Sequence, residues 1–66
     1  MKVTIKRVVT DRKTEERIEI LDEIYSDEVS CLYKSGESGS VFIYFLNGRG
    51  IMVNHSLEEL TSLLNL

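Results

Sequence analysis

The segment from Val41 to Leu60 places the strongest constraint on what this chain can fold into. It reads VFIYFLNGRGIMVNHSLEEL, in which two apolar runs flank Asn47-Gly48 and a leucine-rich run follows. Asn-Gly favours a two-residue type I′ turn, because both central positions of that turn need a positive φ. The segment therefore predicts a β-hairpin that leads directly into a helix.

Both faces of this predicted hairpin are apolar. A two-residue turn would place Tyr44 opposite Ile51 and Phe42 opposite Val53, and side chains alternate in direction along each strand. One face then carries Val41, Ile43, Phe45 and Met52. The other face carries Phe42, Tyr44, Leu46, Ile51 and Val53, with Arg49 at the rim. Since one helix can cover only one face, the hairpin predicts a further partner.

The helix after the hairpin has its own start signal. Ser56 and Glu59 have the S-x-x-E spacing of a capping box, in which each side chain bonds to the backbone N–H of the other residue. The apolar stripe of the helix consists of Leu57, Leu60, Leu63 and Leu64. We expect this stripe to cover the hairpin face that holds Met52, because that face has no tyrosine to keep near water. The opposite face would remain as a contiguous apolar patch, which is typical of an interface.

The first half of the chain predicts further strands. Val3 and Ile5 alternate with polar residues, and so do Val29, Cys31 and Tyr33. Residues 17–25 fit either a strand or a helix, and we favour a strand because the polar loop before them, residues 10–16, has hairpin length. The expected fold is α+β: a single domain over residues 1–66, with a mostly antiparallel meander of four or five strands and one C-terminal helix on one face.

The length of the chain predicts association. Sixty-six residues form one domain, and such a chain buries only about 60% of the surface that its unfolded form exposes. Small domains are usually reinforced by disulfides, a metal or oligomerisation. The single cysteine, Cys31, excludes an internal disulfide, and we expect it to be a small core residue in a protein of the reducing cytoplasm. Oligomerisation or a partner protein is the device that remains.

The charge distribution argues against broad binding to nucleic acid. The net charge is −3, although five of the eight basic residues lie within the first thirteen positions. These five are Lys2, Lys6, Arg7, Arg12 and Lys13. Acidic residues gather from Glu15 to Glu28, so we expect basic and acidic strands to pair side by side. A local basic patch on the N-terminal strand leaves DNA binding open as an alternative.

No constellation for catalysis, metal or cofactor binding is visible. His55 has no orienting partner that the sequence identifies, and we interpret it as a residue of the strand–helix junction. Within each acidic doublet, Asp22-Glu23 and Asp27-Glu28, the two side chains would point to opposite faces of a strand. Neither doublet therefore forms a site alone. The SGESGS loop lacks the Lys-Ser/Thr of a phosphate-binding loop. No apolar run is long enough to span a membrane, and the N-terminus has no signal-peptide pattern.

The stretch FLNGRGIMVNHSLEELTSLL resembles two bacterial families. It is similar to the strand–turn–strand and S-L-x-E-L helix of LytTR-type DNA-binding domains, and to the small flagellar FlbD-type proteins, over residues 41–64. The first resemblance implies DNA binding, and the second implies a short chain that ends in a hairpin and helix.

The sequence as a whole favours a non-enzymatic protein-interaction module of the adaptor or inhibitor type, bacterial or phage in style. It would self-associate as a homodimer, or bind a larger protein, through the hairpin face. The expected interface residues are Phe42, Tyr44, Leu46, Arg49, Ile51 and Val53. The alternative is a small DNA-associated transcriptional regulator that uses the basic N-terminal strand.

Overall fold

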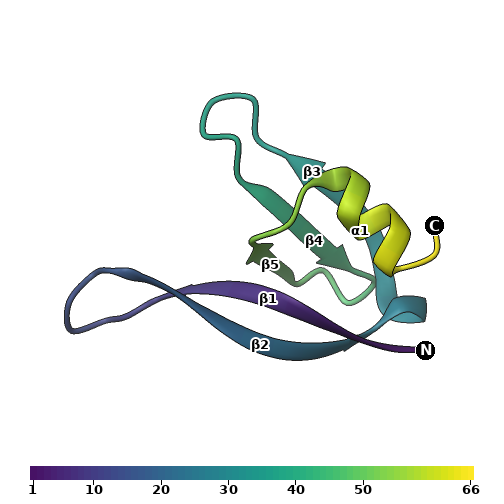
Figure 1. Cartoon of the computed structure of the whole chain (residues 1–66), viewed down its shortest axis with the longest axis horizontal. Helices are drawn as coiled ribbons and strands as arrows, with labels where there is room; N and C mark the ends of the chain where they lie inside the picture. The colour runs from purple at the N-terminus through teal and green to yellow at the C-terminus, as the bar shows by residue number, and fades with distance from the viewer.

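The computed structural model describes residues 1–66 and contains a five-stranded sheet with one C-terminal helix (Figure 1). The elements are β1 (Lys2–Thr10), β2 (Arg17–Tyr25), the 3₁₀ turn η1 (Ser26–Glu28), β3 (Val29–Lys34), β4 (Val41–Phe45), β5 (Gly50–Val53) and α1 (Leu57–Leu63). The predicted α+β fold is confirmed, and residues 17–25 form a strand rather than a helix.

All neighbouring strands are antiparallel, in the order β2-β1-β5-β4-β3. β3, β4 and β5 follow one another as the expected meander requires, and β1 and β2 form a hairpin, but β2 does not pair with β3. β1 departs from that order because it pairs with β5, where Arg7 lies opposite Val53 and Val8 opposite Met52. The first and last strands of the sequence therefore meet in the middle of the sheet, which leaves β2 and β3 as its edges.

The β1–β2 hairpin extends beyond the rest of the sheet as an arm (Figure 1). Its nine pairs run from Lys2 opposite Tyr25 to Thr10 opposite Arg17. β5 has only four residues and its pairing with β1 covers only two of them, so the far end of the arm has no third strand beside it. Ile18 and Ile20 lie on this arm and remain 43% and 40% exposed.

The core lies between the helix and the inner face of the sheet. Its eight buried residues are Val3, Ile5, Ile24, Val41, Ile43, Val53, Leu60 and Leu64. The expected capping box is present: Ser56 Oγ accepts from the Glu59 N–H, and Glu59 Oε1 accepts from the Ser56 N–H, each over 3.0 Å. The helix covers the face of Val41 and Ile43 as predicted, but Leu63 is 39% exposed and does not join the core.

The predicted type I′ turn of the last hairpin is wrong. Only Gly48 has a positive φ, of 87°, and the Gly48 N–H donates to the Phe45 carbonyl over 3.0 Å. Phe45 also pairs with Arg49, so three residues form the loop, as when a type I turn is followed by a left-handed glycine. The Asn47 side chain supports this loop, since its Oδ1 accepts from the Arg49 N–H over 2.9 Å.

The longer loop shifts the pairing of β4 and β5 by one residue. Tyr44 lies opposite Gly50 rather than Ile51, and Phe42 lies opposite Met52 rather than Val53. A one-residue shift moves every side chain of a strand to the other face of the sheet. Ile51 and Val53 therefore face the core, and Met52 faces outward. Val53 is buried and Ile51 packs against the core, where the other register would place one methionine, and this favours the observed register.

Cys31 is exposed, so its predicted place in the core is also wrong. A bulge between Val29 and Cys31 changes the register of β3 against β4. Val29 lies opposite Phe45 and packs against the core, whereas Cys31 lies opposite Tyr44 on the outer face. Because a bulge inserts one unpaired residue, the alternation that the sequence predicts does not continue through it.

Candidate functional site

The outer face of the sheet carries a cluster of three aromatic rings. Tyr33 lies opposite Phe42, and Tyr44 follows two residues later on β4. The ring centroids are 6.2 Å apart for Tyr33 and Phe42, 6.3 Å for Phe42 and Tyr44, and 6.5 Å for Tyr33 and Tyr44. These are the spacings at which aromatic pairs attract one another beyond the area that they bury. The three rings therefore form one contiguous surface.

Gly50 gives the ring of Tyr44 its position. The two residues lie opposite each other, and a Cβ on Gly50 would lie 2.7 Å from Cε1 of Tyr44. The ring can occupy this position beside β5 only because residue 50 has no side chain. A two-residue turn would have placed Gly50 opposite Phe45, and the register shift places it opposite Tyr44 instead.

Smaller apolar side chains extend the cluster on both sides. Met52 lies opposite Phe42 of β4 on one side and opposite Val8 of β1 on the other. Met52 and Val8 are both half-buried. Cys31 lies opposite Tyr44 at the edge of the sheet. We call this surface the aromatic face, and it consists of Val8, Cys31, Tyr33, Phe42, Tyr44 and Met52. Tyr33 is 51% exposed and Tyr44 37% exposed, and α1 covers the opposite face of the sheet.

The residues predicted as an interface are divided by the register shift. Phe42 and Tyr44 belong to the aromatic face, and Leu46 lies in the turn, 71% exposed. Val53 is buried, and Ile51 packs against the core. The predicted interface did not include Tyr33, Cys31 and Met52. The aromatic residues Tyr33 and Phe42, on two strands joined by one loop, were a signal that the two strands pair.

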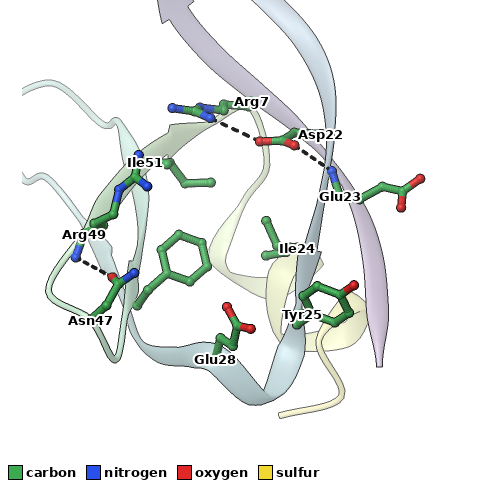
Figure 2. Close-up of a pocket in the computed structure, with 10 residues that line it drawn as sticks. Arg7, Asp22, Glu23, Ile24, Tyr25, Glu28, Asn47, Arg49 and Ile51 are labelled. Atoms are coloured by element: carbon green, nitrogen blue, oxygen red, sulfur yellow. Dashed lines mark hydrogen bonds and ion pairs between the residues drawn. The ribbon is translucent and has the colours of Figure 1, made fainter.

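Arg49 and Ile51 instead line a small cleft, together with Arg7, Asp22 and Ile24 (Figure 2). The cleft has a volume of about 180 Å³. Its Arg7 is already paired, since Nη1 lies 3.2 Å from Oδ2 of Asp22 and the two side chains are 33% and 36% exposed. The Arg7–Asp22 pair therefore closes one wall of the cleft, and Arg49 is the cation of the cleft that remains open to solvent.

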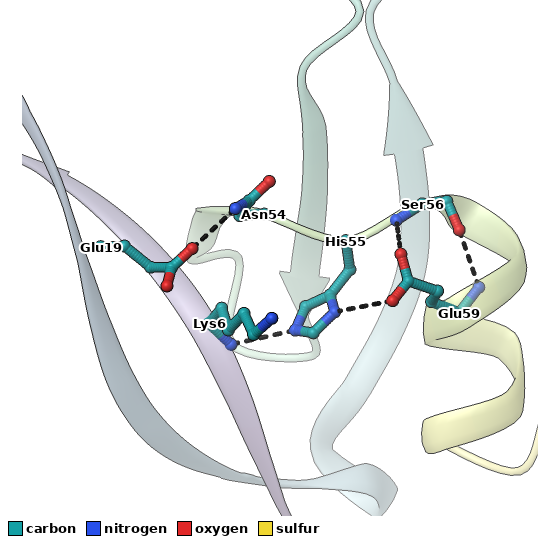
Figure 3. Close-up of polar contacts among 6 residues, drawn as sticks. All are labelled: Lys6, Glu19, Asn54, His55, Ser56 and Glu59. Carbon is teal, nitrogen blue, oxygen red and sulfur yellow. Dashed lines mark hydrogen bonds and ion pairs between the residues drawn. The ribbon is translucent and has the colours of Figure 1, made fainter.

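His55 lies at the junction between β5 and the helix, as predicted, and its side chain is only 7% exposed (Figure 3). Its Nε2 accepts a hydrogen bond from the Lys6 backbone N–H over 3.0 Å. An accepting Nε2 carries no proton, so the imidazole hydrogen is on Nδ1. Nδ1 lies 3.7 Å from Oε2 of Glu59, too far for a hydrogen bond, and has no other partner. Glu59 is the acidic neighbour that the sequence did not identify, although its position four residues later on the helix was a signal.

With Nε2 occupied, His55 is a structural acceptor rather than a free base. The same junction is held by the Asn54 side chain, whose Nδ2 donates to Oε1 of Glu19 over 2.6 Å (Figure 3). Nowhere in the chain do three His, Cys, Asp or Glu side chains lie close enough to share a metal ion. The helix is shorter and less apolar than a membrane-spanning helix.

The basic residues of β1 pair with acids on β2, as predicted. Nζ of Lys2 lies 3.2 Å from Oε2 of Glu23, and Nη1 of Arg7 lies 3.2 Å from Oδ2 of Asp22. Two of the five basic residues of the N-terminal segment are thus partly neutralised. The basic strand does not form an unopposed cationic surface.

Comparison with protein-family models, with curated proteins and with solved structures finds no match for this chain. The resemblance of residues 41–64 to LytTR-type and FlbD-type proteins therefore stays a prediction.

Proposed function

We propose that this protein is a small, non-enzymatic interaction module that self-associates through its aromatic face. The observation that carries this proposal is the arrangement of Tyr33, Phe42 and Tyr44, which pack on one another and remain partly exposed while the helix covers the other face. Monomeric proteins rarely expose a large contiguous apolar patch, and tyrosine is enriched where binding energy is concentrated.

The small core supports association as the reason for the aromatic face. Eight of the 66 residues are buried, and one cysteine cannot form an internal disulfide. A domain of this size gains stability by burying more apolar surface against a partner. A second copy of the chain is always available as that partner. The unpaired thiol supports a location in the reducing cytoplasm.

The alternative, a DNA-associated regulator, has weaker support. It needs a cluster of free cations, whereas Lys2 and Arg7 already lie beside carboxylates. The acidic net charge of −3 also opposes the approach of a phosphate backbone.

Light scattering over a range of concentrations tests the proposal. We expect a dimer that Tyr44→Lys weakens, because lysine would place a charge within the aromatic face. Leu21→Lys is the matched control: Leu21 is 74% exposed on β2, outside the aromatic face, so the dimer should persist. A monomeric wild-type chain at high concentration would contradict self-association. Binding to random duplex DNA that weakens steeply with salt would favour the alternative instead.

A further inference from the structure

β3 is an edge strand whose outward backbone groups are free. On the side of β3 that faces β4, the Ser35 N–H donates to the Ser40 carbonyl over 2.8 Å. This bond continues the register of the β3–β4 pairs. Bonded and non-bonded pairs alternate along an antiparallel ladder. Tyr33 and Cys31 therefore bond to β4, and the N–H and C=O groups of Leu32 and Lys34 point away from the sheet.

The two edges of the sheet differ in how they are protected. Natural edges are usually blocked by charged side chains, prolines or bulges. Along β2 there are four charged residues near the middle and start of the strand: Arg17, Glu19, Asp22 and Glu23. β3 has none from Ser30 to Tyr33, and the chain contains no proline. The bulge lies at the start of β3, so Cys31 to Lys34 remain a regular strand.

We propose that a second copy of the chain adds its β3 antiparallel to this edge, with Leu32 opposite Leu32 on a two-fold axis. This inference rests on the proposed function and specifies how the two copies meet. Each Leu32 would exchange both backbone hydrogen bonds with the other, and the two five-stranded sheets would join into one. Leu32 already packs against the core, so the pair would extend the two inner faces as well.

The outer side chains fit this register. Cys31 of one copy would lie opposite Tyr33 of the other, because paired residues share a face. Cys31 is the smallest side chain of the aromatic face, and its neighbour across the β3–β4 ladder is Tyr44. The ring of Tyr33 from the second copy could therefore reach over Cys31 towards Tyr44. The two aromatic clusters would become one continuous surface, in which each Tyr33 lies beside Cys31 of the other copy.

The charges at the ends of β3 are also complementary in this arrangement. Lys34 ends the strand, and Glu28 immediately precedes it. Antiparallel pairing places Lys34 of one copy beside the start of β3 in the other copy, and Glu28 immediately precedes that start. Lysine and glutamate both have long side chains, so the two charges of each pair would lie at the same end of the joined strands. The two-fold axis creates the pair of Lys34 and Glu28 twice. No two like charges are placed opposite each other along the joined strands.

The test combines charge reversal with cross-linking of the single cysteine. Lys34→Glu should weaken the dimer on the order of fivefold, since two exposed ion pairs are lost. The double variant Lys34→Glu, Glu28→Lys should restore the affinity, because only the signs of the two pairs are exchanged. A short bis-methanethiosulfonate reagent should join two wild-type copies through Cys31. Leu21→Cys in a Cys31→Ser background is the control and should stay unlinked at the same concentration.

Different outcomes separate this geometry from the proposed function. A dimer that neither cross-links through Cys31 nor responds to Lys34→Glu would overturn pairing at β3 but leave association through the aromatic face standing. Failure of the double variant to restore affinity would overturn the register. A monomer under all conditions would overturn both.

Discussion

The His55 imidazole completes the hydrogen bonding of β1 at Lys6, where β5 has already ended. Nε2 of His55 accepts from the Lys6 N–H over 3.0 Å, and the Lys6 carbonyl accepts from the Asn54 N–H over 2.8 Å. A side chain thus takes the place of a strand carbonyl. It links the middle of the sheet to the start of the helix.

Replacement of His55 should expose this link. We expect His55→Phe to lower the free energy of unfolding by about 1 kcal/mol, because the Lys6 N–H loses its acceptor. The Lys6 amide should then exchange faster with solvent, as measured by hydrogen exchange in NMR. His55→Gln keeps a side-chain acceptor and should protect Lys6 better than phenylalanine does. Equal protection of Lys6 in the wild type and in His55→Phe would show that the link is unimportant.

The capping box should make stability depend on acidity. The backbone N–H of Ser56 donates to the Glu59 carboxylate and lowers the pKa of Glu59 below its ordinary value, and neighbouring His55 acts in the same direction. A lowered pKa in the folded state means that this stabilisation is complete above the ordinary glutamate range and is lost as the pH falls through the folded-state pKa.

Thermal unfolding between about pH 6 and about pH 3 would measure this dependence. Glu59→Gln keeps an acceptor for the Ser56 N–H but does not ionise, so its unfolding midpoint should fall less than that of the wild type. Glu58→Gln, at the adjacent position without a bond to Ser56, is the control and should follow the wild type more closely. Parallel curves for Glu59→Gln and the wild type would argue against the role of the carboxylate.

Gly50 should be coupled to Tyr44. We expect Gly50→Ala to cost about 1 kcal/mol of stability, because the new Cβ would lie 2.7 Å from the ring and displace it. In a Tyr44→Ala background the same change should be neutral or stabilising, since alanine is better than glycine in a strand. A double-mutant cycle by urea denaturation measures this coupling. Additive effects would mean that the ring does not depend on Gly50.

The hairpin register can be checked by two neighbouring truncations. Val53 is 4% exposed and Met52 is half-buried on the outer face. Val53→Ala should therefore cost about 2 kcal/mol, and Met52→Ala should cost clearly less in a dilute monomer. Chemical denaturation would give both values. The reverse order would support the two-residue turn and the opposite register.

The local features of this protein follow from its sequence. The capping box of Ser56 and Glu59 involves atoms three residues apart, so its spacing is sufficient to predict it. The strands at residues 2–10 and 17–25 follow from alternation and from the polar loop between them. The pairing of basic β1 with acidic β2 follows from the charges of two segments joined by a short turn. In each case the interacting groups are near one another in the chain, and tertiary packing does not change which groups meet.

Tertiary structure decided which side chains form the aromatic face. The Asn47-Gly48 pair was compatible with two loop lengths, and the packing of Ile51 and Val53 against the core favours the longer one. The bulge in β3 turned Cys31 outward, and the pairing of β1 with β5 placed Val8 beside Met52. Each of these changes moves side chains between faces without changing the secondary structure. Register depends on the total surface that the core can bury, which no local pattern contains, and so the aromatic face could be expected from the sequence while its members could not.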